Sequence, residues 1–563
     1  MNSRLRIFSG LILLSMILSA CASQSTPTPF PSAAPATAAP SPITPAAPTT
    51  APSPAPKPLV VLIDNDEGPI TPANYNTFIG RWLVGWVYDG LYVLDPNDQP
   101  VPNLATSAKS SDDGLTWTIT LRSGVKWHDG QPFTSKDVLF SYDFLKKAGR
   151  DNGLSAVTSM DASGDLGVIL HLSQPQPFFL ADGLAANYIM PEHIWSAQTP
   201  TSGTLSQFQG LIGTGAYKLT KVEPGQFYTF DANPDYFRGA PTVSQIIAKI
   251  VTDRTQQFDQ LKSGEADAVE SSVPPAFVAD LESNPDIKLA HGADFFNYIL
   301  YTNGSRKPFN NPLVRQAIAK AIDTQTLIQT VLVGQGVQLP LNWYHPDLPW
   351  AINIPHIYDP VAAGKALDAA GVVDQNGDGI RDFGGKNTDF GILCDVNNPV
   401  EVRATELIVG WLKAVGLGAH SVCQDINTSV SEIWPNFVAV AKPNYDMAIW
   451  GWSSTPQVQR GFIQIMTNCD FGGLGRFNLT GICDPTLDKL VTEFKTNIDP
   501  TRTEELSVLI QERFAENLPW SPLMSPGGNF AYRPAAYSGW VYTRGTGIVP
   551  IWSFLPASAQ TLP

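Results

Sequence analysis

The folded part of the sequence predicts an α/β protein, because two stretches have the pattern strand, helix, strand. In the first, an apolar strand at Ile246–Val251 precedes a helix over Asp253–Ser263 and a short strand at Ala268–Val269. Gly264 stands where the end of that helix needs a left-handed residue. In the second, a helix over Val400–Val415 separates two short strand patterns. This order is typical of βαβ units, so we expect parallel sheets.

Other segments extend the pattern along the chain. Leu115–Leu121 alternates apolar and polar residues, which is typical of a half-buried strand. Thr134 followed by Asp137 is close to a capping box and predicts the start of a helix. Pro312 favours the first turn of a helix over Asn311–Ile322. The other expected strands are Leu59–Ile63, Phe227–Phe230, Phe295–Tyr301, Phe390–Val396, Ala419–Cys423 and Tyr445–Trp452.

Residues 1–21 predict a lipoprotein signal peptide. Basic residues precede an apolar run over Ile7–Leu18, which is shorter than the ~20 residues that a membrane-spanning helix needs. Ser19 and Ala20 stand directly before Cys21, as in a bacterial lipobox, where the cysteine thiol receives lipid and becomes the new N-terminus. An ordinary cleavage site with a neighbouring cysteine is the alternative. We expect the mature protein to be anchored to the bacterial cell membrane by lipid, on its extracytoplasmic side.

Residues 22–58 are rich in Pro, Ala, Thr and Ser, which predicts an extended tether without a core. The rest of the chain, residues 59–563, is long enough for two or three packed units. The formal net charge of −15 argues against a nucleic-acid partner, because phosphate binding needs clustered Lys and Arg. We find no Gly-x-Ser-x-Gly or His-Glu-x-x-His motif, so the sequence predicts no catalytic residue and no enzyme.

Four cysteines remain after Cys21, an even number that suggests disulfides in an exported protein. Four cysteines allow three connectivities, and we prefer Cys394 with Cys423 and Cys469 with Cys483. The first pair would join neighbouring strands, and the second would close a Gly-rich loop. A zinc site is the alternative, but no CxxC spacing supports it.

Several short motifs resemble those of the family 5 extracytoplasmic solute-binding proteins, which serve ABC importers of peptides, nickel and some oligosaccharides. They occur in the family's order over nearly the whole folded chain, and their combination is far more specific than any one of them. The motifs are Val87-Tyr88-Asp89-Gly90-Leu91, Gly114-Leu115-Thr116-Trp117-Thr118, Val125-Lys126-Trp127-His128-Asp129-Gly130, Gly213-Thr214-Gly215-Ala216-Tyr217, Asn233-Pro234-Asp235-Tyr236-Phe237 and Val314-Arg315-Gln316-Ala317-Ile318.

The resemblance implies a two-lobed periplasmic-binding-protein-like fold of type II, the large peptide-binding class, with mixed sheets and flanking helices. Lobe I would take residues 59–295, with a subdomain at about 96–212, and residues 528–563; lobe II would take residues 296–527. Two crossings, near Phe295–Asn303 and Ser525–Tyr532, would form the hinge. The ligand would lie beyond the carboxyl ends of the strands.

The same resemblance implies a monomeric protein that captures oligopeptides and delivers them to ABC permease subunits, with no cofactor. An oligosaccharide ligand is the alternative within the family. A surface-anchored hydrolase and a receptor-coupled ligand sensor are the alternatives from other classes.

Aromatic residues are the first candidates for ligand contact. Trp450 and Trp452 lie two apart on an expected strand and therefore on one face, where either could stack on a ligand or pack in the core. Trp343, Tyr344 and Trp434 stand in polar, loop-like stretches, where a large aromatic residue often contacts a ligand.

Two polar positions complete the candidate site. In peptide-binding relatives, an Asp that pairs with the peptide α-amino group stands at the position of Thr455, and a hydroxyl group cannot supply that charge. Glu67, just after the first strand, could offer a carboxylate from the other lobe or be a solvated loop residue.

One loop has oxygen-bearing residues at the spacing of an EF-hand calcium loop. The twelfth position is Gly385, so the bidentate carboxylate is missing, and an Asx-turn loop is the alternative to a structural calcium site. The candidate ligands are Asp374, Asn376, Asp378, Ile380 and Asp382.

Overall fold

The computed structural model describes residues 57–560 except residues 69, 76–77, 151, 201–210, 436–437, 455–458 and 474. The signal peptide, Cys21, most of the tether and Thr455 therefore lie outside the described residues. Within the described part, no helix combines the length and hydrophobicity needed to cross a membrane.

Lobe I is built on a mixed sheet with β1 (Leu59–Ile63) at its centre. β1 pairs in parallel with β10 (Gln245–Ile250) on one side and with β11 (Ala268–Val269) on the other. α5 (Arg254–Ser263) connects β10 to β11, and the chain leaves it through Gly264 at a φ of 80°. The predicted βαβ unit is therefore present, but the first strand of the chain lies between its two strands.

Antiparallel strands and the chain's last segment complete lobe I. β9 (Phe227–Ala232) and β8 (Tyr217–Glu223) extend the sheet beyond β10. α1 (Phe78–Val87) packs on the same core as β1, together with Ile548 and Phe554 from the C-terminal segment. The two ends of the folded chain thus share one hydrophobic core.

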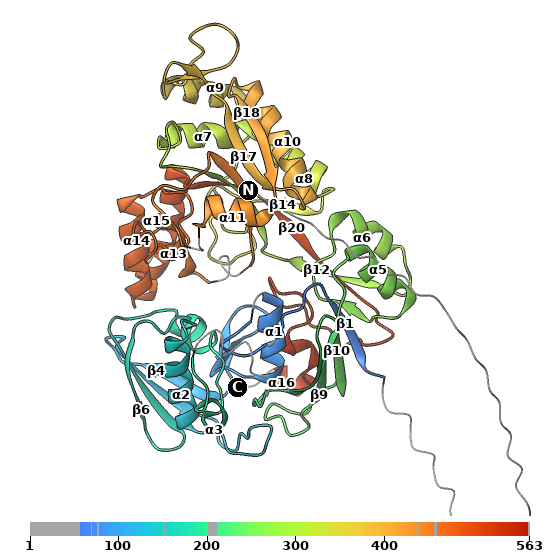
Figure 1. Cartoon of the computed structure of the whole chain (residues 1–563). Coiled ribbons are helices and arrows are strands. Elements are labelled where there is room, and N and C mark those ends of the chain that lie inside the picture. The colour runs from blue at the N-terminus through green and yellow to red at the C-terminus, as the bar shows by residue number, and fades with distance from the viewer. Residues whose placement is uncertain are drawn as a thin grey trace, which may run out of the picture. The chain divides into compact units, whose positions relative to one another are not determined.

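A separate four-stranded antiparallel sheet follows α1 in the chain. Its order is β4 (Ala105–Ser110), β5 (Thr116–Leu121), β7 (Gly167–Leu172) and β6 (Val157–Ala162). α2 (Ser135–Lys147) packs on it and begins with the predicted capping box of Thr134 and Asp137. Figure 1 shows these elements grouped in cyan and teal beside α1.

Lobe II contains the second predicted βαβ unit. β17 (Phe390–Asp395) pairs in parallel with β18 (Ala419–Gln424), and α10 (Pro399–Ala414) connects them. β19 (Met447–Trp452) lies on the other side of β17, also parallel, and pairs antiparallel with β13 (Asn297–Thr302). The helices that cover this lobe include α7 (Pro312–Ala321), α8 (Thr324–Val331), α9 (Pro360–Ala369), α11 (Ile426–Ile433), α13 (Phe462–Thr467), α14 (Pro485–Thr496) and α15 (Pro500–Asn517).

One long strand, β20 (Trp520–Tyr532), belongs to both lobes. Its first part pairs with β13 and β14 (Gly336–Gln338) of lobe II, and its last part with β12 (Lys288–Ala293) and β11 of lobe I. Figure 1 shows it in red, running from the lobe II elements to those around β12. The remaining elements are β2 (Tyr92–Leu94), β3 (Pro100–Pro102), α3 (Glu192–Trp195), α6 (Pro275–Glu282), β15 (Asp382–Phe383), β16 (Lys386–Asn387), α16 (Ala557–Gln560), a π-helical turn at Leu180–Leu184 and a 3-10 turn at Ile551–Phe554.

The motifs noted in the sequence converge in the interior of lobe I. Asp89 accepts hydrogen bonds from Asn103 Nδ2, Thr214 Oγ1 and Tyr236 Oη, each at 2.9 Å. His128 lies 2.9 Å from the carbonyl oxygen of Gly215 through its Nε2 atom. Four of the motifs therefore hold lobe I together by contacting one another.

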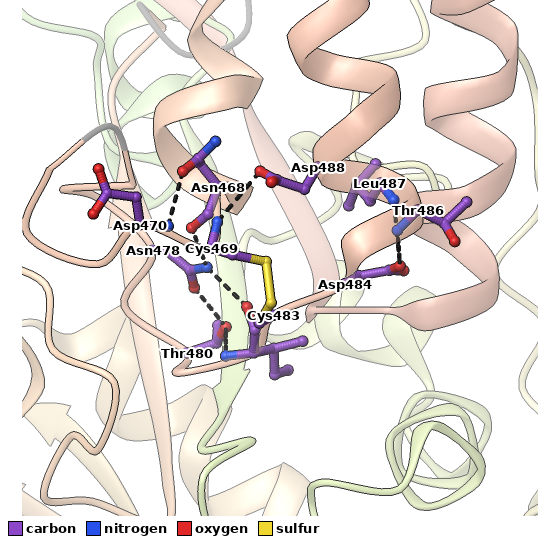
Figure 2. Close-up of a disulfide and its surroundings, with 11 residues drawn as sticks. Asn468, Cys469, Asp470, Asn478, Thr480, Cys483, Asp484, Thr486, Leu487 and Asp488 are labelled. Carbon is purple, nitrogen blue, oxygen red and sulfur yellow. Dashed lines mark hydrogen bonds between the residues drawn. A yellow bond between two sulfur atoms is a disulfide. The ribbon is translucent and has the colours of Figure 1, made fainter.

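Both disulfides have the preferred connectivity. Cys394 on β17 pairs with Cys423 on β18, with their Cα atoms 4.5 Å apart. Cys469 pairs with Cys483 at a Cα separation of 4.8 Å. Figure 2 shows the second disulfide beside Asn478, whose Nδ2 atom donates to the backbone oxygens of Asn468 and Ile482 at 3.1 and 2.8 Å. The disulfide and this amide close the same loop.

Replacing Cys469 and Cys483 together by alanine should lower the free energy of unfolding by about 3 kcal/mol, because the disulfide closes a loop of roughly 15 residues. Denaturant unfolding monitored by tryptophan fluorescence measures the change. Dithiothreitol should destabilise the wild-type protein in the same direction. Equal midpoints for the variant and the wild type would contradict a stabilising role for this disulfide.

Candidate ligand-binding cleft

A cavity of about 740 Å³ lies between the two lobes. Lobe I contributes residues 270–277, and lobe II contributes residues 330–333, 398–400 and 453–454, with Arg403. The segments that connect the lobes contribute Asp294, Phe296 and Gly527. Its volume is in the range of known ligand sites.

The cavity lies where strands of both sheets end. Glu270 directly follows β11, and Ser453 directly follows β19. Asn398, at the start of α10, stands three residues after the end of β17. This is the edge at which open α/β sheets place their ligands, as the resemblance implied.

The two arginines that line the cavity form ion pairs within the described part of the chain, whereas its two acidic residues do not. Arg254 Nη2 lies 2.9 Å from Asp64 Oδ2, and Arg403 Nη1 lies 2.7 Å from Glu406 Oε2. Among the described residues, no basic nitrogen lies within 4.0 Å of a carboxylate oxygen of Glu270 or Asp294. The wall therefore has two carboxyl groups without a cationic partner.

Burial changes how these two groups titrate. It raises the pKa of Glu270 to about 8, with a hydrogen bond from Ser271 acting in the opposite direction and the carboxylate of Asp64 in the same direction. Burial also raises the pKa of Asp294 to about 7. Removal from water disfavours the charged form of a carboxyl group, which explains both shifts.

The lobes also touch away from this cavity. Lys495 Nζ on α14 lies 3.5 Å from Asp182 Oδ2 in the π-helical turn of lobe I. The rings of Phe178 and Phe494 are 5.0 Å apart between their centroids. Burial raises the pKa of Asp182, and the ammonium group of Lys495 opposes the rise. These contacts exist only while the lobes are together.

Three of the predicted aromatic residues form a cluster in lobe II. Trp434 lies against Trp452 and Phe477, with ring centroids 6.2 and 4.9 Å apart, and Trp450 lies 6.2 Å from Trp452. Trp452 Nε1 donates to Tyr301 Oη at 2.7 Å. All three tryptophans are half-buried, and none of them lines the 740 Å³ cavity. A role in ligand contact remains a prediction for them.

The expectation for Trp343 and Tyr344 was wrong. Both are buried in the core of lobe II, with 0% and 4% of their surface exposed. Trp343 adopts a φ of 73°, and its Nε1 atom donates to Asn297 Oδ1 at 3.1 Å. The left-handed backbone at Trp343 stands within a polar segment, and its ring lies against Phe514, Trp520 and the neighbouring Tyr344, which the local polarity of the sequence does not reveal.

Glu67 is neither a solvated loop residue nor part of the cavity wall. It is 1% exposed, and Asn65 Nδ2 donates to its Oε1 atom at 3.1 Å. Its carboxyl group faces α1, where a Cβ atom on Gly80 would lie 2.3 Å from Oε2. The absence of a side chain at Gly80 therefore leaves space for the Glu67 carboxyl group inside lobe I.

The calcium interpretation is not supported. Asp374 accepts hydrogen bonds from the backbone nitrogens of Gly377 and Gly379 at 2.7 and 2.9 Å, and Asp378 accepts one from Ile380 at 2.8 Å. Asp382 accepts one from Gln375 N at 2.8 Å. Within the described residues, no three His, Cys, Asp or Glu side chains are grouped to hold a metal ion. The loop's own backbone thus uses these oxygens, with Asx turns at Asp378 and at Asn376, whose Oδ1 accepts from Asp378 N at 2.8 Å.

Sequence reasoning missed the carboxyl groups of the cavity, Glu270 and Asp294. One signal was available for Glu270, because it directly follows a predicted strand of a parallel sheet and so stands at the ligand edge. No signal marked Asp294, whose position depends on how the two lobes meet.

The family model described as "Bacterial extracellular solute-binding proteins, family 5 Middle" matches residues 99–473. The chain belongs to this family. Among curated family 5 relatives, the oligopeptide-binding protein AppA of Bacillus subtilis (strain 168) is 26% identical over 455 residues, which cover 78% of this chain and 80% of AppA.

Solved structures show the same two-lobed fold. AppA of Bacillus subtilis, solved in complex with a nonapeptide, superposes with a TM-score of 0.72 at 23% identity and covers 89% of this chain and 99% of that chain. NikA of Brucella suis, solved in complex with Fe(III)-EDTA, superposes with a TM-score of 0.76 at 20% identity, with 89% and 100% covered.

Proposed function

We propose that this protein binds oligopeptides between its lobes and delivers them to the permease subunits of an ABC importer. The observation that carries the proposal is a 740 Å³ cavity, lined by both lobes, in a family 5 chain. The name of its relative AppA, an oligopeptide-binding protein, supports peptides as the ligand class.

The binding mechanism follows from the cavity's position. A ligand that touches both lobe I at Glu270 and lobe II at Ser453 gains all its contacts only in the closed arrangement, so binding shifts the population towards closure. The contacts of Lys495 with Asp182 and of Phe178 with Phe494 favour the same arrangement. A permease that recognises the closed shape would thus receive loaded protein, and no covalent step is needed.

The N-terminus supports an anchored location for this binding. We propose that residues 1–21 are a lipoprotein signal peptide, that Cys21 carries the lipid, and that residues 22–58 lift the folded part away from the membrane. The protein would then act as a monomer on the extracytoplasmic side. Loss of membrane association in a Cys21→Ala variant, measured by fractionation, tests this.

The division of the chain is part of the same proposal. Residues 59–295 and 528–563 form lobe I, with a subdomain at about 96–212, and residues 296–527 form lobe II. β20, which pairs with strands of both lobes, supports a crossing within residues 525–532. The protein acts as a binding protein and not as an enzyme.

The ligand class is tested by thermal unfolding of the mature protein with peptides of two to nine residues and with oligosaccharides of similar size. A true ligand at 100 times its Kd should add about 2.7 kcal/mol of stability. We expect peptides to stabilise the protein and oligosaccharides to leave it unchanged. Stabilisation by oligosaccharides alone, or turnover of any of these compounds, would overturn the proposal.

Two tryptophan variants test whether the ligand binds in this cavity. Ser453 is exposed and lines the cavity, so Ser453→Trp should fill it and weaken peptide binding about tenfold or more. Ser421 is exposed on β18, away from the cavity, and Ser421→Trp is the matched control. Calorimetric titration measures both affinities. Equal loss in the two variants would contradict this location.

A further inference from the structure

We propose that Glu270 and Asp294 form a binding site for a positively charged group of the ligand, an ammonium or guanidinium group. This inference rests on the proposed function and deepens it, because it names the peptide feature that the cleft selects. The group can be the free α-amino terminus of a peptide or the side chain of Lys or Arg.

The first support is the state of Glu270. Its side chain lines the cavity although only 5% of the residue is exposed. Ser271 Oγ donates to Oε2 at 2.6 Å, and no group of the described residues donates to Oε1. This oxygen is nearly buried, faces the cavity and has no hydrogen-bond donor among those residues. It is therefore suited to accept a hydrogen bond from the ligand.

The second support is Asp294, which comes from a different part of the chain. It follows β12, lines the same cavity, and accepts no hydrogen bond from the residues that the structure describes. The next residue, Phe295, is 0% exposed and has a φ of 59°, a conformation that costs a non-glycine residue free energy. This strained turn fixes the backbone beside Asp294.

The excess of acidic over basic groups around Glu270 also favours a positively charged ligand group. The carboxylates of Asp64 and Asp294 both raise the pKa of Glu270, and Arg254 is, of the described residues, the one cation that opposes this rise. Arg254 is already held by Asp64 at 2.9 Å. One added positive charge would therefore compensate carboxyl groups that the protein leaves unpaired.

The walls around the acids suit a cation with an apolar stem. Aromatic side chains supply much of the lining, and an aromatic face attracts a neighbouring cation. Those that line the cavity are Trp82, Phe277, Phe296, Tyr298 and Phe530. A hydrated metal ion would not use these faces, whereas a peptide amine or a basic side chain would.

Four peptides of equal length, which differ only in their positive groups, distinguish binding of the α-amino group from binding of a basic side chain. One has a free amino terminus and no basic residue, one is N-acetylated with a lysine, one has both positive groups, and one has neither. We expect the last to bind the wild-type protein about tenfold or more weakly than at least one of the first two. Whichever of those two binds tightly identifies the source.

Variants assign the selectivity to the two acids. Glu270→Gln and Asp294→Asn keep the shape of each side chain and remove its charge, so each should reduce the advantage of charged over neutral peptides about tenfold. Glu265 is exposed on the same lobe, outside the cavity, and Glu265→Gln is the matched control for charge. Thermal unfolding confirms that each variant is folded.

Proton release gives a readout that needs no variant. A cation placed beside Glu270, with its raised pKa of about 8, should favour the ionised form, so binding at pH 7 should release about one proton. Calorimetry in buffers of different ionisation enthalpy measures this, and the release should fall at pH 9. The charged or titratable groups that face the two acids are Asp64, Arg254, Tyr298 and Tyr542.

The outcomes are distinguishable. Selectivity for charged peptides that falls in E270Q or D294N, with proton release, supports the inference. Equal affinity for charged and neutral peptides in the wild-type protein overturns it while peptide binding stands. Failure of all four peptides to bind overturns both the inference and the proposed function.

Discussion

Asp89→Ala should lower the free energy of unfolding by about 4 kcal/mol, the largest loss we expect from one polar substitution in lobe I. The carboxyl group is 6% exposed and accepts three hydrogen bonds, from Asn103, Thr214 and Tyr236. Alanine would leave all three donors buried without an acceptor, and each such donor costs about 1–3 kcal/mol. Urea unfolding followed by circular dichroism measures the loss.

Two further variants test whether the loss of stability comes from the hydrogen bonds of Asp89. Asp112 is exposed, and Asp112→Ala should change the stability by less than about 0.5 kcal/mol. Asp89→Asn keeps an oxygen acceptor and should lie between the alanine variant and the wild type. A destabilisation of Asp89→Ala no greater than that of Asp112→Ala would show that the network does not hold lobe I together.

Arg315→Met should destabilise lobe II by a similar amount, about 4 kcal/mol. Arg315 is 2% exposed, and its guanidinium group donates to the backbone oxygens of Phe309, Asn517 and Leu518 at 2.7, 2.5 and 3.0 Å. Two of these oxygens end α15, where a positive charge is favourable, so methionine would remove both the donors and the charge.

Lysine tests whether geometry or charge matters more at this position. Arg315→Lys keeps the charge but cannot reach three carbonyl groups as the planar fork does, so it should recover less than half of the loss. Lys365 is exposed on α9, and Lys365→Met is the control for removal of a surface cation. Full recovery by lysine would assign the effect to charge alone.

The sequence predicted the elements of this fold better than their arrangement. The strands and helices of the two βαβ units, around α5 and α10, are present because local signals, such as apolar runs and the left-handed Gly264, act within the segment itself. The insertion of β1 between β10 and β11 could not be predicted in this way, since pairing across about two hundred residues leaves no local pattern.

The site was harder to predict than the fold for the same reason. Trp343 stands in a polar segment, and its burial depends on a left-handed backbone and on Asn297 from β13. Asp294 is one acid among many in the sequence, and it becomes part of a cavity only because segments of both lobes meet there. The motifs that identified the family instead lie in the interior of lobe I, around Asp89.

The continuity of β20 has a mechanical consequence. A strand that is hydrogen-bonded into both lobes prevents them from moving as independent bodies, so rotation must be absorbed as torsion along that strand. Gly527 and Gly528 begin the part of β20 that pairs with β12, directly after the part that pairs with β14, and a Cβ atom on Gly528 would lie 3.0 Å from Gly292 O and 3.1 Å from Asp294 N. Rotation of one lobe against the other at this junction would therefore also move the backbone beside Asp294.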